Sequence, residues 1–415
     1  MTANGLGERY AKLWTSAGLS NLADGAMKVA LPLVAIRHTD SPALIAGLSF
    51  AFTLPWLFFA LTAGALADRM DRRRLMLVAN AARALFLACL TVVTVAGAGS
   101  LWLLYAAAIC IGIAETVYDT SSQSILPQLV PRELLSRANG RLYAAELTAN
   151  QFVGPPLGGF LVAIGVGVAF GTPVLLWVAA IGVLLLVRGR YVSGRTGSTT
   201  IRADIGEGLR FLAGNTLLRT LAIMVGVFNF ASSAAFTVFV LYAAGPNSTM
   251  KLSDPAYGLL LTASAVGSVL GTFLAEPAER LLGRSRALLL SIAGSLLTVA
   301  TPAFTANPFI IAAAFLVGGV TVSVWNVITV SLRQRVTPTR LLGRLNSAYR
   351  LLAWGTMPLG AVAGGLIGQT LGVRWVFVIM GALVLLQLIP MVWITDRRID
   401  EAEAQVEAEE APASR

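Results

Sequence analysis

The chain has 415 residues, of which 56% are hydrophobic and only 13% are charged, and its mean hydropathy is +0.75. Soluble domains usually carry about 25% charged residues, so this composition indicates an all-α integral membrane protein. The net charge of +10 does not point to nucleic acid, because the arginines lie in short clusters between apolar runs without interleaved aromatic residues. Two cysteines within apolar runs and one histidine predict neither a disulfide framework nor a metal site.

Twelve transmembrane helices are predicted from apolar windows of about 20 residues, the length that crosses a bilayer. The N-terminal stretch lacks the pattern of a cleavable signal peptide, so the first helix is expected to remain in the mature protein. The expected spans are 14–36, 43–67, 75–97, 101–125, 139–164, 169–188, 217–243, 256–276, 286–304, 308–331, 344–368 and 373–394.

The basic residues predict the orientation of these helices. Most of the 31 Lys and Arg residues fall on the same side as the N-terminus, and only Arg37, Lys251 and Arg374 fall in loops on the other side. Because basic loops stay in the cytoplasm, both termini are expected to be cytoplasmic, in the inner (plasma) membrane of a bacterium.

An internal repeat divides the chain into two halves of the same orientation. The segment PRELLSRAN at 131–139 returns as PTRLLGRLN at 338–346, and Asn21 matches Asn229. The expected organisation is a six-helix bundle at 1–188, a linker with an amphipathic helix at 189–216, a second six-helix bundle at 217–395 and an acidic disordered tail at 396–415.

Ionisable side chains within the predicted spans are the candidate functional residues. Charges in a membrane interior are costly, face the protein interior and mark ion or substrate pathways. The first helix carries Asn21, Asp24 and Lys28 on one face, and the fourth carries Glu115, Tyr118 and Asp119 at i, i+3 and i+4. The third, fifth and eleventh helices add Arg83, Glu146 and Arg350.

All embedded carboxylates lie in the N-terminal half, whereas the matching C-terminal face carries Asn229, Ser232, Trp325 and Asn326. This difference predicts that Asp24, Glu115, Asp119 and Glu146 handle protons, with Lys28, Arg83 and Arg350 as charge partners. Substrate is expected to contact Asn21, Tyr118 and the four neutral residues of the C-terminal face.

Structural roles compete with these assignments. Asp24 and Lys28 can form a static i, i+4 ion pair, and Glu146 can be neutralised by Arg141, Arg83 or Arg350. Aromatic residues in membrane helices also serve as packing or interface anchors.

One loop motif and one helix motif, added to the repeat of six helices, resemble the major facilitator superfamily, whose two six-helix halves hold substrate between them. GALADRMDRR at 64–73 is similar to the family's cytoplasmic loop signature, although Asp71 stands where glycine is usual. The resemblance implies a conformational latch, whereas the arginines alone can be a topology anchor. Its residues are Gly64, Asp68, Arg69, Arg72 and Arg73.

GPPLGG in the fifth predicted span resembles the helix-kink motif of the superfamily's proton-coupled exporters, which implies export. Its residues are Gly154, Pro155, Gly158 and Gly159. A generic crossing of small residues is the competing explanation.

Four longer stretches resemble the drug:proton antiporter branch that includes macrolide efflux proteins, Tap-like multidrug pumps and enterobactin exporters. They are SNLADGAMKVALPL, ETVYDTSSQSILPQLV, SRANGRLYAAELTANQFVGPPLGG and LLGRLNSAYRLLAWGTMPLGAVAGG. The fourth predicted span, however, lacks the embedded arginine followed by glycine of better-known drug antiporters, and offers Glu115 and Asp119 instead.

The resemblance implies a monomeric secondary transporter that exports amphipathic drugs by proton antiport, with no cofactor besides the proton gradient. The alternatives are an exporter of siderophores or other metabolites, and a lysophospholipid flippase or uptake carrier of the same fold. An enzyme is not expected, because the chain has no usable nucleophile motif and no phosphate-binding loop.

Overall fold

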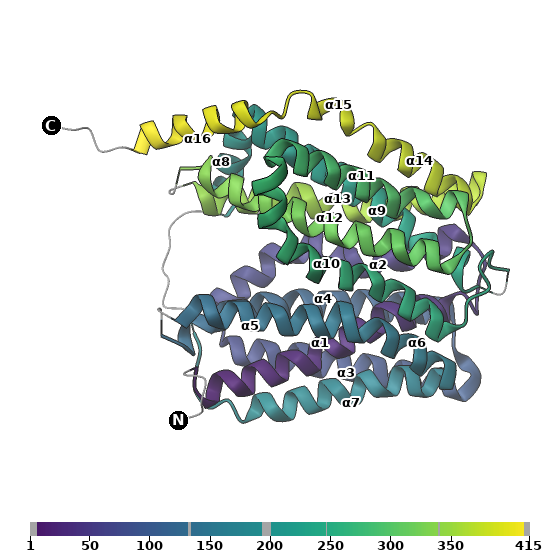
Figure 1. Cartoon of the computed structure of the whole chain (residues 1–415). Helices are drawn as coiled ribbons and strands as arrows, with labels where there is room; N and C mark the ends of the chain where they lie inside the picture. The colour runs from purple at the N-terminus through teal and green to yellow at the C-terminus, as the bar shows by residue number, and fades with distance from the viewer. Residues whose placement is uncertain (1–5, 132–133, 193–200, 246, 339–340, 411–415) are drawn as a thin grey trace. The chain divides into compact units, whose positions relative to one another are not determined.

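The computed structural model describes residues 6–131, 134–192, 201–245, 247–338 and 341–410, and within these ranges the chain forms helices and no strand (Figure 1). Side-chain caps fix several helix starts. Ser41, Ser100 and Asn307 accept the first free amides of the helices that follow them.

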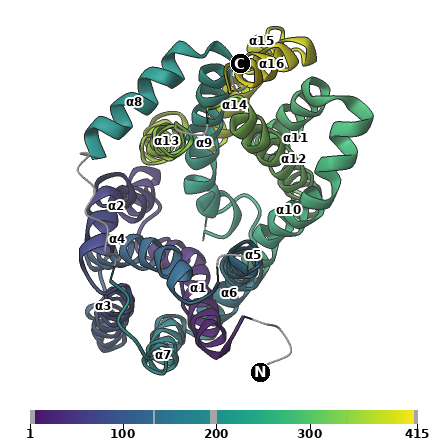
Figure 2. The same ribbon diagram turned by 90° about the vertical axis from the view of Figure 1, so that its left-hand side faces the viewer.

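The helices fall into two compact units. Unit 1 comprises Met1–Gly197 together with Phe239–Thr262. Its helical segments are α1 (Glu8–Ala35), α2 (Pro42–Arg69), α3 (Arg72–Val93), η1 (Thr94–Ala98), α4 (Leu101–Ile125), η2 (Leu126–Gln128), α5 (Leu135–Leu147), η4 (Thr148–Val153), α6 (Gly154–Ile164) and α7 (Val166–Leu185). Within this unit α1 packs on α6 and α7, α2 packs on α4, and α3 packs on α4 and α7 (Figure 2).

Unit 2 comprises Ser198–Val238 and Ala263–Arg415. The remaining helices are α8 (Ile201–Gly214), α9 (Thr216–Ala243), α10 (Asp254–Leu282), α11 (Arg284–Phe304), α12 (Pro308–Arg335), α13 (Leu342–Leu371), α14 (Val373–Leu385), α15 (Leu388–Met391) and α16 (Asp396–Glu410). In this unit α11 packs on α12 and α14, and α13 packs on α8 and α14. Two helices, α9 and α10, pass from one unit to the other.

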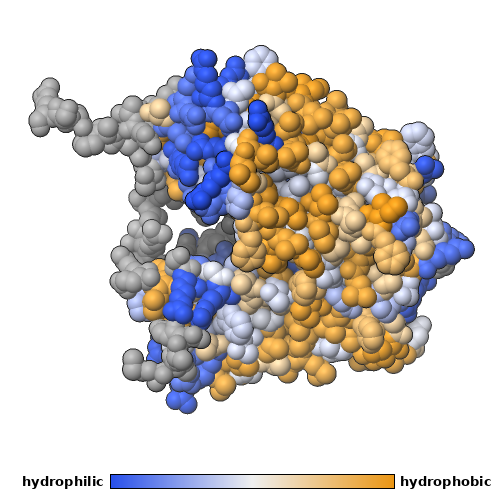
Figure 3. Space-filling model, in the orientation of Figure 1, coloured by the Kyte–Doolittle hydropathy of each residue, from blue (hydrophilic) through white to orange (hydrophobic). Residues whose placement is uncertain are grey.

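Ten helices in the described ranges are long and apolar enough to cross a membrane. The two other predicted spans are helical as well. One is α1, which carries Asp24 and Lys28, and the other is divided into α5, η4 and α6. Large apolar side chains such as Phe58, Phe273 and Phe309 are more than half exposed, and apolar surface covers much of the visible face in Figure 3. A soluble protein rarely exposes patches of this size, so these surfaces meet lipid.

The two units do not follow the predicted segments. Residues 239–262, the end of α9 and the start of α10, group with the N-terminal bundle, whereas α8 of the predicted linker and α16 of the predicted tail group with unit 2. Arg37 of the α1–α2 loop forms a 2.8 Å ion pair with Asp254, and the amide of Asn247 donates to Asp40 at 3.2 Å. Apolar windows do not reveal contacts of this kind.

The tail was expected to be disordered, and this is wrong for residues 396–410, which form α16. Arg284, at the start of α11, lies 2.9 Å from Glu403 of this helix, and Asp396 accepts a hydrogen bond from the amide of Ser285. The acidic composition thus provides partners for basic residues of unit 2. The predicted linker helix is present as α8, where Glu207 pairs with Arg344 of α13.

Candidate functional site

A buried ion pair joins α1 to α3 in unit 1. Arg83 Nη1 is 2.6 Å and 2.7 Å from the two carboxylate oxygens of Asp24. No part of the Arg83 side chain and only 2% of the Asp24 side chain is exposed. Removing one partner of a buried ion pair costs about 3–5 kcal/mol, so each ion depends on the other.

The rest of the Arg83 guanidinium is enclosed by polar and aromatic side chains. Nη2 donates to Asn80 Oδ1 at 2.8 Å and to Ser20 Oγ at 3.3 Å. The rings of Tyr118 and Trp177 lie 4.8 Å and 5.3 Å from its central carbon, which is cation–π geometry. Tyr118 was expected to contact substrate. In the structure its side chain packs against the Arg83 cation, and Tyr118 is only 1% exposed.

A second ion pair joins α1 to α4. Lys28 Nζ lies 3.5 Å from Glu115 Oε1, while Glu115 Oε2 is buried and has no hydrogen bond to any described residue. The i, i+4 pair between Asp24 and Lys28 is thus not formed, because each of these residues pairs with another helix. Lys28 also donates to Asn150 Oδ1 at 3.0 Å.

Asn150 belongs to η4, the π-helical segment that interrupts the fifth predicted span. Its Nδ2 donates to Asn21 Oδ1 at 3.3 Å, so it links Lys28 to the amide of Asn21. Gly25 of α1 lies directly against the backbone here, since a Cβ at residue 25 would be 2.5 Å from the Asn150 carbonyl oxygen. Widened turns of this kind often occur at functional sites.

Two further carboxyl groups in this region are partly buried and unpaired. Among the described side chains, neither Asp119 of α4 nor Glu146 of α5 has an ion pair or hydrogen bond. With Asp24 and Glu115 they make four carboxyl groups, against the two cations Arg83 and Lys28. The side chain of Arg350, the third expected partner, lies outside the described residues.

The predicted latch is described only in part, because the surroundings of Gly64 and the side chain of Asp68 lie outside what the structure describes. Arg73 donates to the carbonyl oxygens of Leu184 and Leu185 at 3.1 Å and 2.9 Å, and so caps the end of α7. Arg72 Nε donates to the Ala67 carbonyl at 3.1 Å, and Arg69 is exposed at the end of α2.

Asp71, the departure from the loop signature, is the N-cap of α3. One carboxylate oxygen accepts from the amide of Arg74 at 3.2 Å, and the other accepts from the amide of Tyr191 at 3.1 Å. The loop is therefore held by two caps, one at the start of α3 and one at the end of α7.

GPPLGG begins α6 and forms two close crossings in unit 1. A Cβ at Gly154 would lie 2.6 Å from Gly25 Cα, and Gly158 faces the carbonyl of Ala26, so both contact α1. Gly159 faces the carbonyl of Asp254 at the start of α10. Pro155 is buried in the first turn, directly after the π-helical segment.

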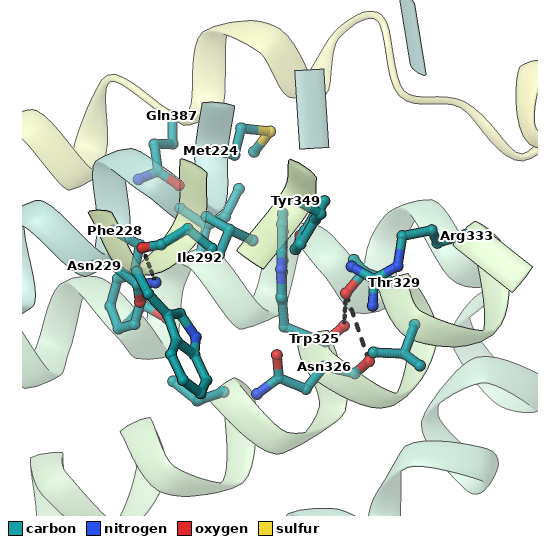
Figure 4. Close-up of a pocket in the computed structure, with 16 residues that line it drawn as sticks. Met224, Phe228, Asn229, Ile292, Trp325, Asn326, Thr329, Arg333, Tyr349 and Gln387 are labelled. Atoms are coloured by element: carbon teal, nitrogen blue, oxygen red, sulfur yellow. Dashed lines mark hydrogen bonds between the residues drawn. The ribbon is translucent and has the colours of Figure 1, made fainter. Parts of the chain in front are cut away.

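Three of the four neutral residues expected to bind substrate line a cavity of about 270 Å³ within unit 2. They are Asn229, Trp325 and Asn326, whereas Ser232 is not among the lining residues. Sequence reasoning missed Arg333, Tyr349 and Gln387, which also line the cavity (Figure 4). Arg333 lies beyond the predicted span 308–331, but it belongs to the last turn of α12.

A family model described as transmembrane secretion effector matches residues 7–414 of the chain. The multidrug efflux pump Tap of Mycolicibacterium fortuitum is 26% identical over 399 residues, which cover 91% of this chain and 92% of that protein. The enterobactin exporter EntS of Salmonella choleraesuis is 28% identical over 331 residues, which cover 78% and 77% of the two chains.

Among solved structures, a bacterial homologue of the iron transporter ferroportin, in an inward-facing state, has a similar fold. The TM-score is 0.71 at 20% identity, and the match covers 92% of this chain and 98% of that one. This likeness covers most of both chains and supports the predicted fold class.

Proposed function

We propose that this chain, which belongs to the transmembrane secretion effector family of the major facilitator superfamily, exports amphipathic small molecules in exchange for protons. Membership makes it a membrane transporter and not an enzyme. Drug export is a finer proposal, which the relative named as a multidrug efflux pump supports. Proton antiport is proposed from the embedded carboxyl groups of unit 1. We also propose cytoplasmic termini, a bacterial inner membrane and a monomer.

The observation that carries proton coupling is an excess of carboxyl groups among the membrane-embedded side chains described in unit 1, where four carboxyl groups stand against the two cations Arg83 and Lys28. Glu115 is central, since one oxygen lies 3.5 Å from Lys28 and the other is buried without a partner. A proton on the free oxygen removes the negative charge that holds Lys28. For unit charges about 4 Å apart that attraction is roughly 4 kcal/mol at an effective dielectric constant of 20. Protonation therefore changes the contact between α1 and α4.

Alternating access turns this change into transport. When Glu115 and Lys28 are open to the outside, Glu115 takes up a proton. When they are open to the cytoplasm, Lys28 competes with the proton for the Glu115 carboxylate, and the proton is released. Entry of one proton down a membrane potential of about 100 mV releases roughly 2.3 kcal/mol, which supports an approximately 40-fold gradient of a neutral compound.

The test is proton release from acid-loaded inside-out vesicles on addition of a macrolide, a tetracycline, a cationic dye or a siderophore. We expect release that depends on compound in wild type and disappears in Glu115→Gln. Glu8→Gln is the matched control, because Glu8 is 77% exposed and pairs only with Lys12 among the described residues. Unchanged coupled transport in Glu115→Gln removes Glu115 from the mechanism.

A second candidate is an exporter of siderophores or related metabolites, which the likeness to an enterobactin exporter favours. The same vesicles separate the two candidates. Proton release that occurs with the siderophore, and with none of the other compounds, assigns a metabolite exporter. Transport of a compound without proton release instead indicates a facilitator or flippase.

A further inference from the structure

The cavity of unit 2 has a distinct chemical character. It lies between α9, α11, α12 and α13, and its volume of about 270 Å³ is close to the lower end of the roughly 300–1,000 Å³ of small-molecule pockets. Phe228, Trp325, Ile292 and Met224 supply aromatic and apolar walls. Walls of this kind provide partners for stacking with an aromatic ring.

One end of the cavity carries a cation without an acidic partner. Arg333 lies 4.1 Å above the ring of Tyr349, and its Nε is buried without a hydrogen bond. No carboxylate in the described part of the chain lies within ion-pair distance of Arg333. By contrast, Arg335, two residues further along α12, lies 3.7 Å from Glu403. A partly buried cation of this kind attracts an anion.

The other side of the cavity offers amide groups. Gln387 is only 7% exposed, and its Nε2 is a buried donor without a partner. Figure 4 shows Gln387 with Phe228 and Asn229 on one side, and Arg333 with Tyr349 and Thr329 on the other. Asn229 Nδ2 is already used by the carbonyl of Ala353 at 2.7 Å. A buried donor without a partner costs free energy, so the site favours a ligand that brings a hydrogen-bond acceptor.

We propose that this cavity binds an aromatic organic anion. Its carboxylate or phenolate is held by Arg333, its ring packs against Phe228 and Trp325, and an acceptor group reaches Gln387. That the anion is also the exported compound rests on the proposed function, whereas its binding does not. The two units then divide the work: unit 1 carries the proton and unit 2 recognises the acidic group of the cargo.

Three probes with the same rings test this proposal on the purified full-length protein by isothermal titration calorimetry. They are 1-naphthoate, the neutral 1-naphthamide and the cationic 1-naphthylmethylammonium. We expect naphthoate to bind at least tenfold more tightly than the other two, because a charge-assisted hydrogen bond is worth about tenfold to a hundredfold in affinity. Equal binding of the three probes, or preference for the cation, overturns the proposal.

Arg333→Gln should weaken naphthoate binding about tenfold to a hundredfold and leave naphthamide unchanged. Arg335→Gln is the matched control, since Arg335 lies on the same helix outside this cavity. Unchanged naphthoate affinity in Arg333→Gln contradicts the assignment. If that variant does not fold, Arg333→Lys, which keeps the charge, must still prefer naphthoate over naphthamide. Proton release is measured separately, so failure of antiport and failure of anion binding are distinguishable.

Discussion

Replacing Asp24 by Asn should destabilise the protein strongly, because it leaves Arg83 buried without a counterion. The remaining acceptors are Asn80 at 2.8 Å and Ser20 at 3.3 Å, and both are neutral. Loss of one partner of a buried pair costs about 3–5 kcal/mol. We therefore expect the free energy of unfolding to fall by that amount, measured by thermal unfolding of detergent-purified protein and followed by circular dichroism.

The double replacement Asp24→Leu with Arg83→Met should be less harmful than the single one. Replacing a buried ion pair by apolar side chains is often neutral or stabilising, and the main loss is the two hydrogen bonds to Asn80 and Ser20. At about 1 kcal/mol each, the expected cost is about 2 kcal/mol. If the double variant is as unstable as Asp24→Asn, the uncompensated charge is not the cause. A folded double variant that still couples protons to transport assigns the pair a structural role.

Three further changes test other contacts. Gly25→Ala places a methyl group 2.5 Å from the Asn150 carbonyl oxygen and should lower the free energy of unfolding by about 1–3 kcal/mol. Gly18→Ala is the control, because a Cβ at residue 18 meets nothing within 4 Å. Equal thermal midpoints of the two variants contradict the close crossing of α1 with Asn150. Arg73→Gln removes the cap of α7 and should speed hydrogen exchange of the backbone amides at 184–188. Amide protection equal to that of wild type argues against the cap. Truncation before Asp396 removes the acceptor of the Ser285 amide and should speed exchange at the start of α11, and an unchanged rate contradicts that role for α16.

The membrane-spanning architecture could be predicted from the sequence because hydrocarbon requires long apolar helices. Charge patterning also singled out Asp24, Lys28, Arg83 and Glu115, which form the two ion pairs of unit 1, since an ionisable group in a membrane helix must face other protein groups. Pairing could not be predicted in the same way. The spacing of Asp24 and Lys28 permits an ion pair within α1, but tertiary packing places Arg83 and Glu115 closer to them.

Neutral polar partners were missed for a physical reason. Asn80 and Asn150 are not costly enough in a membrane helix to stand out from sequence, yet they complete the hydrogen bonds of Arg83 and Lys28. A useful signal was present in both cases: Asn80 precedes Arg83 by three residues, and Asn150 stands four residues before GPPLGG. Asp71 was noted as a departure from a motif, but its position before an arginine-rich helix is typical of an N-cap.

The internal repeat separates what the fold requires from what function has added. Asn21 and Asn229 occupy matching positions, and both make hydrogen bonds at the crossing with the fifth helix of their own half. In unit 1 the crossing joins Asn21 to Asn150 through side chains. In unit 2 Asn229 donates to the carbonyl of Ala353 at 2.7 Å.

The next turn repeats this contact. Ser233 Oγ donates to the carbonyl of Met357 at 2.7 Å, where unit 1 instead has Gly25 against the backbone of Asn150. Unit 2 thus maintains the same crossing with a hydroxyl and an amide, and without an embedded ion pair at these positions. The crossing with the fifth helix therefore does not need charge. The ion pair between Lys28 and Glu115 joins α1 to α4 instead, and we propose that it serves to move protons.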